Sequence, residues 1–455
     1  MIAIGAAENL ASLLIESAKI LVGNELTTAN LRIEDELITE VSKLKSTQKA
    51  DLKINAEGLI ALPGMIDAHV HLRDLEFSYK ETFETGTQAA AVGGFTTVID
   101  MPNTRPPTIT GGSLAAKMSS AQGRLYSNVA FQGNLTDDPD ELNQMIELGA
   151  IAFKLYLNKT LETFDSSDDV KLTSALRNAK ESNALVTVHA ESGAEIRRIQ
   201  QESLAEHKTS VRDFLKAHSP QIEVSAVRRI LDLGARVGAN LHVCHITIPE
   251  SVRLVRRSPN ATCEAAAHHL LLNHRVFRTQ GTLAICVPPI RAEEHRRGLW
   301  RQFSNGHVNI LASDHAPHTL DEKIKQNAFE AASGVPGLET SLPVLFTQVS
   351  KRRLTLRRLV EATATVPAKI FGLRKKGWLK EGFDADIVLV DPKAKVKIDP
   401  EKFFTKAKYS PFKGMRCTGA AAYTIVNGVI VAERGKILGP PVGRVTKSDR
   451  ACVSS

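Results

Sequence analysis

The stretch IDAHVHLR at residues 66–73 decides the architecture expected of this chain. Apolar residues alternate here with polar ones, and side chains two apart on a strand share a face. His69, His71 and Arg73 are therefore expected to point the same way. Two imidazoles on one face of a strand can bind a divalent cation such as zinc. A pair of structural histidines would give the same local pattern, so this stretch alone leaves both interpretations open.

Short apolar runs alternate with amphipathic stretches through the middle of the chain, which is typical of repeated βα units. We predict eight strands, each followed by a region able to form a helix. Parallel strands need both faces covered, and a (β/α)8 barrel of the TIM type is the simplest closed arrangement that provides this. The predicted strands span residues 60–71, 95–101, 126–132, 150–156, 184–190, 239–245, 260–264 and 308–314.

Both ends of the chain are rich in β-forming sequence. Short strands with Gly and Asn between them are predicted in the first 60 residues, and the same texture returns near residues 386–428. We therefore predict an α/β protein in which both ends build one small β-sandwich beside the barrel. The predicted divisions are 1–60 for the first part of the sandwich, 61–375 for the metal-dependent barrel, and 376–455 for the second part and a tail.

Composition excludes several classes of protein. Hydrophobic residues make up 43% and charged residues 24%, which is ordinary for a globular protein. Neither an apolar run long enough for a membrane span nor a basic leader before an apolar segment is evident, so we expect no membrane partner and no secretory signal. The scattered cysteines favour a reducing cytoplasm over a disulfide scaffold. They are Cys244, Cys263, Cys286, Cys417 and Cys452.

The formal net charge of +8 raises the question of nucleic-acid binding. The basic residues form only short runs on predicted helices, and aromatic residues, at 5%, are too few to suggest a platform for stacked bases. We expect solvated helix faces that also attract acidic metabolites, and no nucleic-acid partner.

Further metal-binding side chains follow other predicted strands. His189 ends the fifth strand, His245 the sixth and Asp314 the eighth. Because the C-terminal ends of barrel strands meet at one catalytic face, these residues and the pair in residues 66–73 should converge there. The sequence therefore predicts a metal site. Strand alternation places His242 and Cys244 on the opposite face from His245, so we expect both to be packing residues.

Lys154 lies in the apolar fourth strand, within IAFKLYL at residues 151–157. Burial favours a neutral amine, which can react with carbon dioxide to give an anionic carbamate able to bridge two cations. Alternatively, the lysine keeps its ammonium and pairs with an acid. Spacing alone leaves these alternatives open.

Three motifs resemble the amidohydrolase superfamily and, within it, the dihydroorotases. They are DAHVHLR at 67–73, MPNT at 101–104, and ASDHAPH at 312–318 with Lys323 five residues on. The resemblance covers roughly residues 12–435. It implies reversible cyclisation of N-carbamoyl-L-aspartate to L-dihydroorotate, with release of water, in pyrimidine biosynthesis.

The resemblance also implies the roles of the site residues. One divalent ion, for which imidazole ligands favour Zn²⁺, would be held by His69, His71 and Asp314, and a second by His189 and His245. A CO₂-derived carbamate on Lys154 and a hydroxide would bridge them, and Asp314 would act as the catalytic acid and base. The residues implied in substrate binding are Arg73, Asn103 and His318 for the carboxylate, and Pro336 and Gly337, in the loop 334–337, for the ring.

The chain departs from the family pattern on the substrate side. After Arg73 the family usually continues Asp-Pro-Gly, whereas here Asp74, Leu75 and Glu76 follow, and Val287 stands where many bacterial relatives have an Asn that can contact substrate. The polar segment 158–169 is expected to be either a lid or a plain loop.

Other functions remain open from the sequence. The same metal site would serve a hydantoinase, dihydropyrimidinase or allantoinase acting on a neutral cyclic ureide. A non-catalytic scaffold of the same fold is the alternative from another class. The expected partner is a small-molecule substrate, and self-association or association with other pyrimidine-pathway enzymes stays open.

Overall fold

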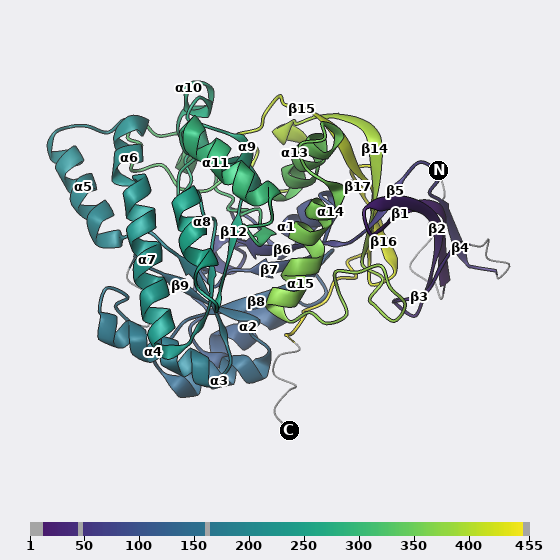
Figure 1. Cartoon of the computed structure of the whole chain (residues 1–455), viewed down its shortest axis with the longest axis horizontal. Helices are drawn as coiled ribbons and strands as arrows, with labels where there is room; N and C mark the ends of the chain where they lie inside the picture. Colours follow the sequence, from purple (N-terminus) through teal and green to yellow (C-terminus); the bar gives the residue numbers. More distant parts are fainter. Residues whose placement is uncertain (1–11, 44–48, 160–163, 449–455) are drawn as a thin grey trace.

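Residues 12–43, 49–159 and 164–448 are described by the computed structural model, and two sheets organise them (Figure 1). One sheet forms a barrel surrounded by helices, and the other gathers strands from both ends of the chain at its side. Among the described residues, no helix is both long and apolar enough to cross a bilayer.

The barrel sheet contains eight strands that pair in sequence order, and every pairing is parallel. Its first and last strands meet where Val70 bridges to His315 and the His71 N–H donates to the His315 carbonyl at 2.8 Å. The predicted (β/α)8 fold is thus confirmed. The strands are β6 (Met65–Val70), β7 (Phe95–Asp100), β8 (Asn128–Asn134), β9 (Ala152–Tyr156), β10 (Leu185–His189), β11 (Asn240–Val243), β12 (Ala261–Ala265) and β13 (Ile310–Leu311).

Helices cover the outside of the barrel, and their ends follow local sequence rules. Thr82 caps α1 with its side chain, Pro139 opens α3, and Gly149 ends α3 in the left-handed conformation. The helices are α1 (Phe83–Val92), α2 (Gly111–Ala121), α3 (Pro139–Leu148), α4 (Asp169–Glu181), α5 (Gly193–Ala205), α6 (Val211–Ala217), α7 (Pro220–Val237), α8 (Pro249–Arg256), α9 (Ala267–Leu271), α10 (Val276–Gln280), α11 (Glu293–Ser304), α12 (Leu320–Lys323), α13 (Leu338–Ser350), α14 (Leu356–Val360) and α15 (Val366–Phe371). Short 3-10 turns are η1 (Leu75–Phe77), η2 (Gly281–Ala284) and η4 (Pro400–Lys402), and the π-helical η3 (Glu361–Thr365) joins α14 to α15.

The second sheet joins the two ends of the chain, as predicted. Its central contact is the antiparallel pairing of β5 with β14, which connects an N-terminal strand to a C-terminal one. Apolar residues from both ends, such as Ile15, Leu31 and Ile387, form its core. The strand order is β17 (Lys436–Ile437), β16 (Val429–Glu433), β15 (Arg416–Val426), β14 (Ile387–Lys397), β5 (Ile60–Pro63), β1 (Ser12–Val22), β2 (Glu25–Glu34) and β3 (Leu37–Ser42), with β4 (Leu52–Asn55) paired to β1.

The single strand predicted at residues 60–71 is wrong, because the chain divides there between the two sheets. β5 belongs to the end sheet and β6 to the barrel, with Gly64 between them. A Cβ atom on Gly64 would lie 2.2 Å from Thr96 Oγ1, so only glycine fits at this crossing. A continuous apolar run does not reveal such a transfer, because both strands are buried.

Candidate active site

The metal-binding residues predicted from the sequence lie at the mouth of the barrel, meaning the rim formed by the C-terminal ends of its strands. His69 and Lys154 lie on β6 and β9, and His189 is the last residue of β10. The others, which are His71, His245 and Asp314, follow the ends of β6, β11 and β13. All six side chains are buried.

His69, His71 and Asp314 form the first cluster. The Nε2 atoms of the two histidines lie 3.5 Å and 3.4 Å from Asp314 Oδ1. Burial acts to raise the pKa of Asp314, but the neighbouring imidazoles hold it well below its usual range, so the group is a carboxylate. Burial lowers the pKa of His71 to about 3. Two ring nitrogens and a carboxylate oxygen therefore face one point.

His189 and His245 form the second cluster, beside the first. His189 Nδ1 lies 3.1 Å from His245 Nε2, and the His245 ring centroid is 5.1 Å from that of His69. Burial lowers the pKa of both His189 and His245, so both rings are neutral, which is the form that binds metals. The five predicted ligands other than Lys154 thus make one continuous group.

Lys154 lies among these imidazoles. Its ammonium is fully buried, donates to Cys244 Sγ at 3.0 Å and lies 5.3 Å from the centre of the Tyr156 ring. Burial of His189 is the main cause of its lowered pKa, and the charge of Lys154 also lowers it. Among the described residues no ion pair joins Lys154 to a carboxylate, so the alternative of an ammonium paired with an acid is not what the structure shows.

The expectation that Cys244 packs away from the site is wrong. Strand alternation holds only within a strand, and β11 ends at Val243, after which His245 adopts a left-handed φ of 33°. The Cys244 sulfur consequently contacts Lys154. His242, inside the strand, does pack in the core, where its ring bonds Thr262 at 2.7 Å and Glu264 at 3.1 Å.

Two buried carboxylates that the sequence reasoning missed support the histidines from behind. Glu264 Oε1 lies 2.6 Å from His69 Nδ1, and Glu191 Oε2 lies 2.8 Å from His189 Nε2. Such contacts fix ring orientation and raise ligand basicity. An acid within or just beyond a barrel strand was the signal that could have found them. The other oxygen of Glu191 bonds His218 at 2.9 Å.

These donors fit a pair of divalent cations. Four imidazoles, a carboxylate and a lysine amine converge, and imidazole with carboxylate is a donor set suited to zinc. Burial and Lys154 act to lower the pKa of His69, but Glu264 and Asp314 raise it to about 10, so the surroundings favour positive charge there. His245 Nδ1 is buried with no hydrogen-bond partner among the described residues.

Beside the predicted metal ligands lies a cationic region, in which Arg73 and Lys80 contact the ring of His318. Arg73 Nη2 and Lys80 Nζ lie 3.1 Å and 3.2 Å from the two ring nitrogens of His318. Burial, with these two cations, lowers the pKa of His318 to about 2, so its ring is neutral and can accept. Lys80 was not predicted, and it also pairs with Glu322 at 2.7 Å.

Asn103 contacts the first cluster through His71. Its Oδ1 accepts from His71 Nδ1 at 2.7 Å, which directs the other ring nitrogen towards Asp314. Because the carbonyl oxygen is engaged in this way, the amide N–H groups remain available as donors to an anion. The predicted substrate residue therefore also positions a predicted metal ligand.

The backbone after Arg73 is strained. Arg73, Asp74 and Leu75 have φ values of 59°, 44° and 49°, a left-handed conformation that costs non-glycine residues free energy. Asp74 holds the turn, because its carboxylate accepts from the Phe83 N–H at 2.7 Å and from Arg124 Nη2 at 2.7 Å. The turn that carries Leu75 and Glu76, in place of the usual Pro-Gly, is thus held by the hydrogen bonds of the Asp74 side chain.

The loop at residues 334–337, which includes Pro336 and Gly337, is buried at the mouth. Gly337 donates its N–H to His315 Nδ1 at 3.2 Å, next to Asp314. Lys323 donates to three carbonyls, those of Ile285, Ala332 and Gly334, at 2.7, 2.8 and 2.9 Å. Lys323 thereby joins this loop to the segment that precedes Val287. Val287 itself packs in an apolar cluster with Phe214.

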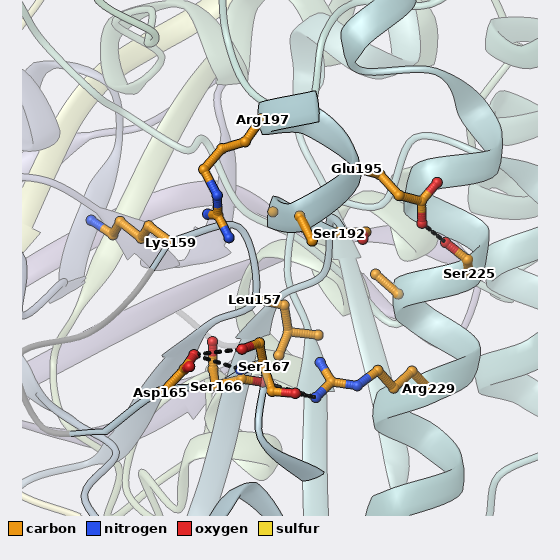
Figure 2. A pocket seen from close by; sticks show the side chains of 13 residues that line it. Leu157, Lys159, Asp165, Ser166, Ser167, Ser192, Glu195, Arg197, Ser225 and Arg229 are labelled. Atoms are coloured by element: carbon orange, nitrogen blue, oxygen red, sulfur yellow. Dashed lines mark hydrogen bonds between the residues drawn. The ribbon is translucent and has the colours of Figure 1, made fainter. Parts of the chain in front are cut away.

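A pocket of about 280 Å³ lies beside the mouth, between the segment after β9 and the start of α5 (Figure 2). Figure 2 shows Arg229 and Ser167 meeting on one wall and Arg197 on another. Arg229 also pairs with Asp169 at 2.6 Å, which fixes the end of segment 158–169 to α7. Residues 160–163 of that segment lie outside the described residues, and its role as a lid stays a prediction.

Comparison with known proteins gives a consistent family. The model of the Amidohydrolase family matches residues 60–431. Dihydroorotase from Methanosarcina acetivorans is 34% identical over an alignment that covers 92% of this chain and 91% of the dihydroorotase. Allantoinase from Salmonella choleraesuis is 32% identical, with 92% and 94% covered. The solved structure of L-hydantoinase (dihydropyrimidinase) from Arthrobacter aurescens superposes with a TM-score of 0.92 at 32% identity, covering 96% and 99%.

Proposed function

Because the chain belongs to the amidohydrolase family and is a cyclic amidohydrolase, we propose that it is a dihydroorotase. It would interconvert N-carbamoyl-L-aspartate and L-dihydroorotate. The observation that carries this proposal is the buried Arg73 beside the metal-binding residues, grouped with Lys80 and His318. A planar guanidinium suits a carboxylate, and dihydroorotate carries one outside its ring, whereas hydantoin and allantoin do not.

We propose that two divalent ions, with zinc favoured, bind at the mouth. His69, His71 and Asp314 would hold one, His189 and His245 the other, and a CO₂-derived carbamate on Lys154 would lie between them. When bound, such a pair polarises a carbonyl and brings the pKa of water towards neutrality. The buried position of the Lys154 amine among the imidazoles supports the carbamate.

In the cyclisation direction, the ureido nitrogen attacks the carboxylate carbon of the same molecule, a C–N bond forms, and water leaves. Asp314 accepts one ureido proton and passes it to the departing oxygen, and a second proton from solvent lets that oxygen leave as water when the C–O bond breaks. Arg73, Asn103 and His318 orient the remaining carboxylate. Holding both reacting groups in one molecule lets proximity replace a strong nucleophile. Pro336 and Gly337 would meet the ring through their backbone.

The test is a substrate profile combined with metal analysis on one preparation of the full chain. We expect turnover of dihydroorotate and carbamoyl aspartate, about two divalent ions per chain, and little activity on hydantoin or allantoin. Rapid turnover of a neutral ureide with none of dihydroorotate would overturn the proposal.

A second candidate is a hydantoinase or allantoinase. Two observations favour it: relatives with those names match almost as closely as dihydroorotases, and Val287, which stands where many bacterial dihydroorotases have an Asn, packs in an apolar cluster with Phe214. The same profile decides between them.

For the non-catalytic scaffold, the discriminating result is a protein that stays inactive and metal-free after divalent metal and bicarbonate are supplied.

The proposed substrate is a small molecule, and the proposed location is the cytoplasm. The four cysteines within the described residues are free thiols, which supports a reducing compartment. Self-association and association with other pyrimidine-pathway enzymes stay predictions.

A further inference from the structure

A third group of metal-binding side chains lies at the mouth and has no part in the proposed reaction. His268 and His269 lie on α9, directly after β12, and Cys286 follows the turn η2. One ligand atom from each of the three lies within 4.8 Å of the others. All three side chains are almost fully buried, at 2%, 2% and 1% exposure.

The histidines of this group present unpartnered nitrogens. His269 Nε2 donates to the Pro288 carbonyl at 2.9 Å, so its Nδ1 carries a lone pair. The Cys286 sulfur lies 3.4 Å from the same carbonyl and 3.8 Å from His269 Nε2, so the thiol must leave this carbonyl when a metal binds. That Nδ1 and His268 Nε2 are buried with no hydrogen-bond partner among the described residues. Buried polar atoms normally find partners, and two orphaned nitrogens within one small cluster point to a missing ligand.

The protonation states suit a cation. Burial lowers the pKa of His268 to about 4, and burial also lowers that of His269, so both rings are neutral. The carboxylate of Asp314 is close enough to act on both, which favours positive charge nearby. The Cys286 thiol has its pKa raised to about 12 by burial, so it is protonated until a metal displaces the proton.

We propose that His268, His269 and Cys286 form a third metal site, which takes a thiophilic d¹⁰ cation such as Zn²⁺ or Cd²⁺. Two imidazoles and one thiolate are a ligand set that selects such ions over Mg²⁺ or Ca²⁺. Binding forms one metal–sulfur bond and two metal–nitrogen bonds, and it releases the thiol proton to solvent. The ion would tie α9 to the segment that carries Val287, and its binding is independent of which substrate the enzyme uses.

The test uses Cd²⁺ as the probe on the full chain after the catalytic ligands have been loaded with Zn²⁺. Cadmium bound to a thiolate gives a charge-transfer band in the ultraviolet, which reports sulfur ligation without measuring activity. Three proteins are compared: wild type, Cys286→Ser, and Cys417→Ser as a matched control at another buried free cysteine. Bound cadmium is counted in each.

We expect the wild type and Cys417→Ser to bind one more Cd²⁺ than Cys286→Ser and to show the band, which Cys286→Ser loses. An undiminished band in Cys286→Ser would overturn the site, because the sulfur would then belong to another residue such as Cys244. Absence of the band in the wild type would also overturn it. Should Cys286→Ser fail to fold, ¹¹³Cd NMR of the wild type decides: a resonance typical of one sulfur and two nitrogens supports the site, and one with only nitrogen and oxygen ligands refutes it.

Discussion

Replacing Glu264 by Gln tests whether the carboxylate behind His69 strengthens metal binding. Glu264 Oε1 bonds His69 Nδ1 at 2.6 Å and the His245 N–H at 3.3 Å, and Oε2 bonds His242 Nε2 at 3.1 Å. Gln has the same shape and keeps one acceptor oxygen for His69 and His245. Its amide N–H₂ can donate to His242 Nε2, because His242 Nδ1 can then donate to the Thr262 hydroxyl.

The substitution therefore removes charge while it keeps the hydrogen-bond count. A hydrogen bond to a charged group contributes about 1.5–3 kcal/mol and a neutral one about 0.5–1.5 kcal/mol. The difference of about 1.4 kcal/mol corresponds to a tenfold change in affinity. We expect Glu264→Gln to weaken the ion at His69 by about 10- to 100-fold, the range usual for partners of metal ligands.

The assay is titration of metal-free protein with Zn²⁺ against a competing chelator, with two sites resolved. Glu191→Gln is the matched control, because Glu191 supports His189 in the same way and its loss should weaken the other ion. If Glu264→Gln binds both ions as tightly as the wild type, His69 is not a ligand supported by this carboxylate, and the assignment of the first cluster fails.

Four further predictions follow from the same structure. Lys154→Ala should abolish activity and lose metal, measured by turnover and metal analysis; full activity would exclude the carbamate bridge. Arg73→Lys should raise KM for dihydroorotate about tenfold, since a lysine lacks the planar fork; unchanged steady-state kinetics would remove the main support for the substrate. Lys323→Met should leave the Ala332 carbonyl unpaired, because the carbonyls of Ile285 and Gly334 still accept from the Gly334 N–H and the Tyr409 hydroxyl; urea unfolding should therefore show a loss of about 1–3 kcal/mol, and an unchanged midpoint would contradict this. Burial raises the pKa of Glu339 to about 7, so the folded state holds a proton that the unfolded state releases at lower pH. Glu339 should therefore lower the free energy of unfolding by up to about 1.4 kcal/mol per pH unit as the pH rises towards 7, and Glu339→Gln should reduce the slope measured by urea unfolding by that amount; an equal slope in both proteins would refute it.

The convergence of the candidate metal ligands could be predicted from the sequence because one rule of barrel geometry was enough. Once the strands are identified, their C-terminal ends must meet, and His189, His245 and Asp314 stand at those ends. The rule fails one residue beyond a strand. Cys244 was misplaced because β11 had already ended and alternation no longer applied.

Partners that are distant in the chain could not be predicted in this way. Glu264 and His69 are separated by 195 residues, and their contact depends on how β12 and β6 face each other across the barrel. Lys80 lies just after the turn η1, where periodicity carries no information about direction. Contacts of this kind depend on the packing of the whole barrel, whereas the positions of the candidate ligands depend only on which segments are strands.

The two departures from the dihydroorotase pattern both fall on the substrate side of the site. Proline fixes φ near −65°, so it could not adopt the φ of 49° that Leu75 has, and the backbone beside Arg73 must differ from that of a relative with Asp-Pro-Gly. Val287 stands where many bacterial relatives have an Asn, and its side chain packs in an apolar cluster with Phe214. The metal ligands show no such change. Dihydroorotases, hydantoinases and allantoinases match this chain at similar identity over nearly its whole length, so identity over the whole chain does not separate their substrates, and the residues that contact the ring have to do so.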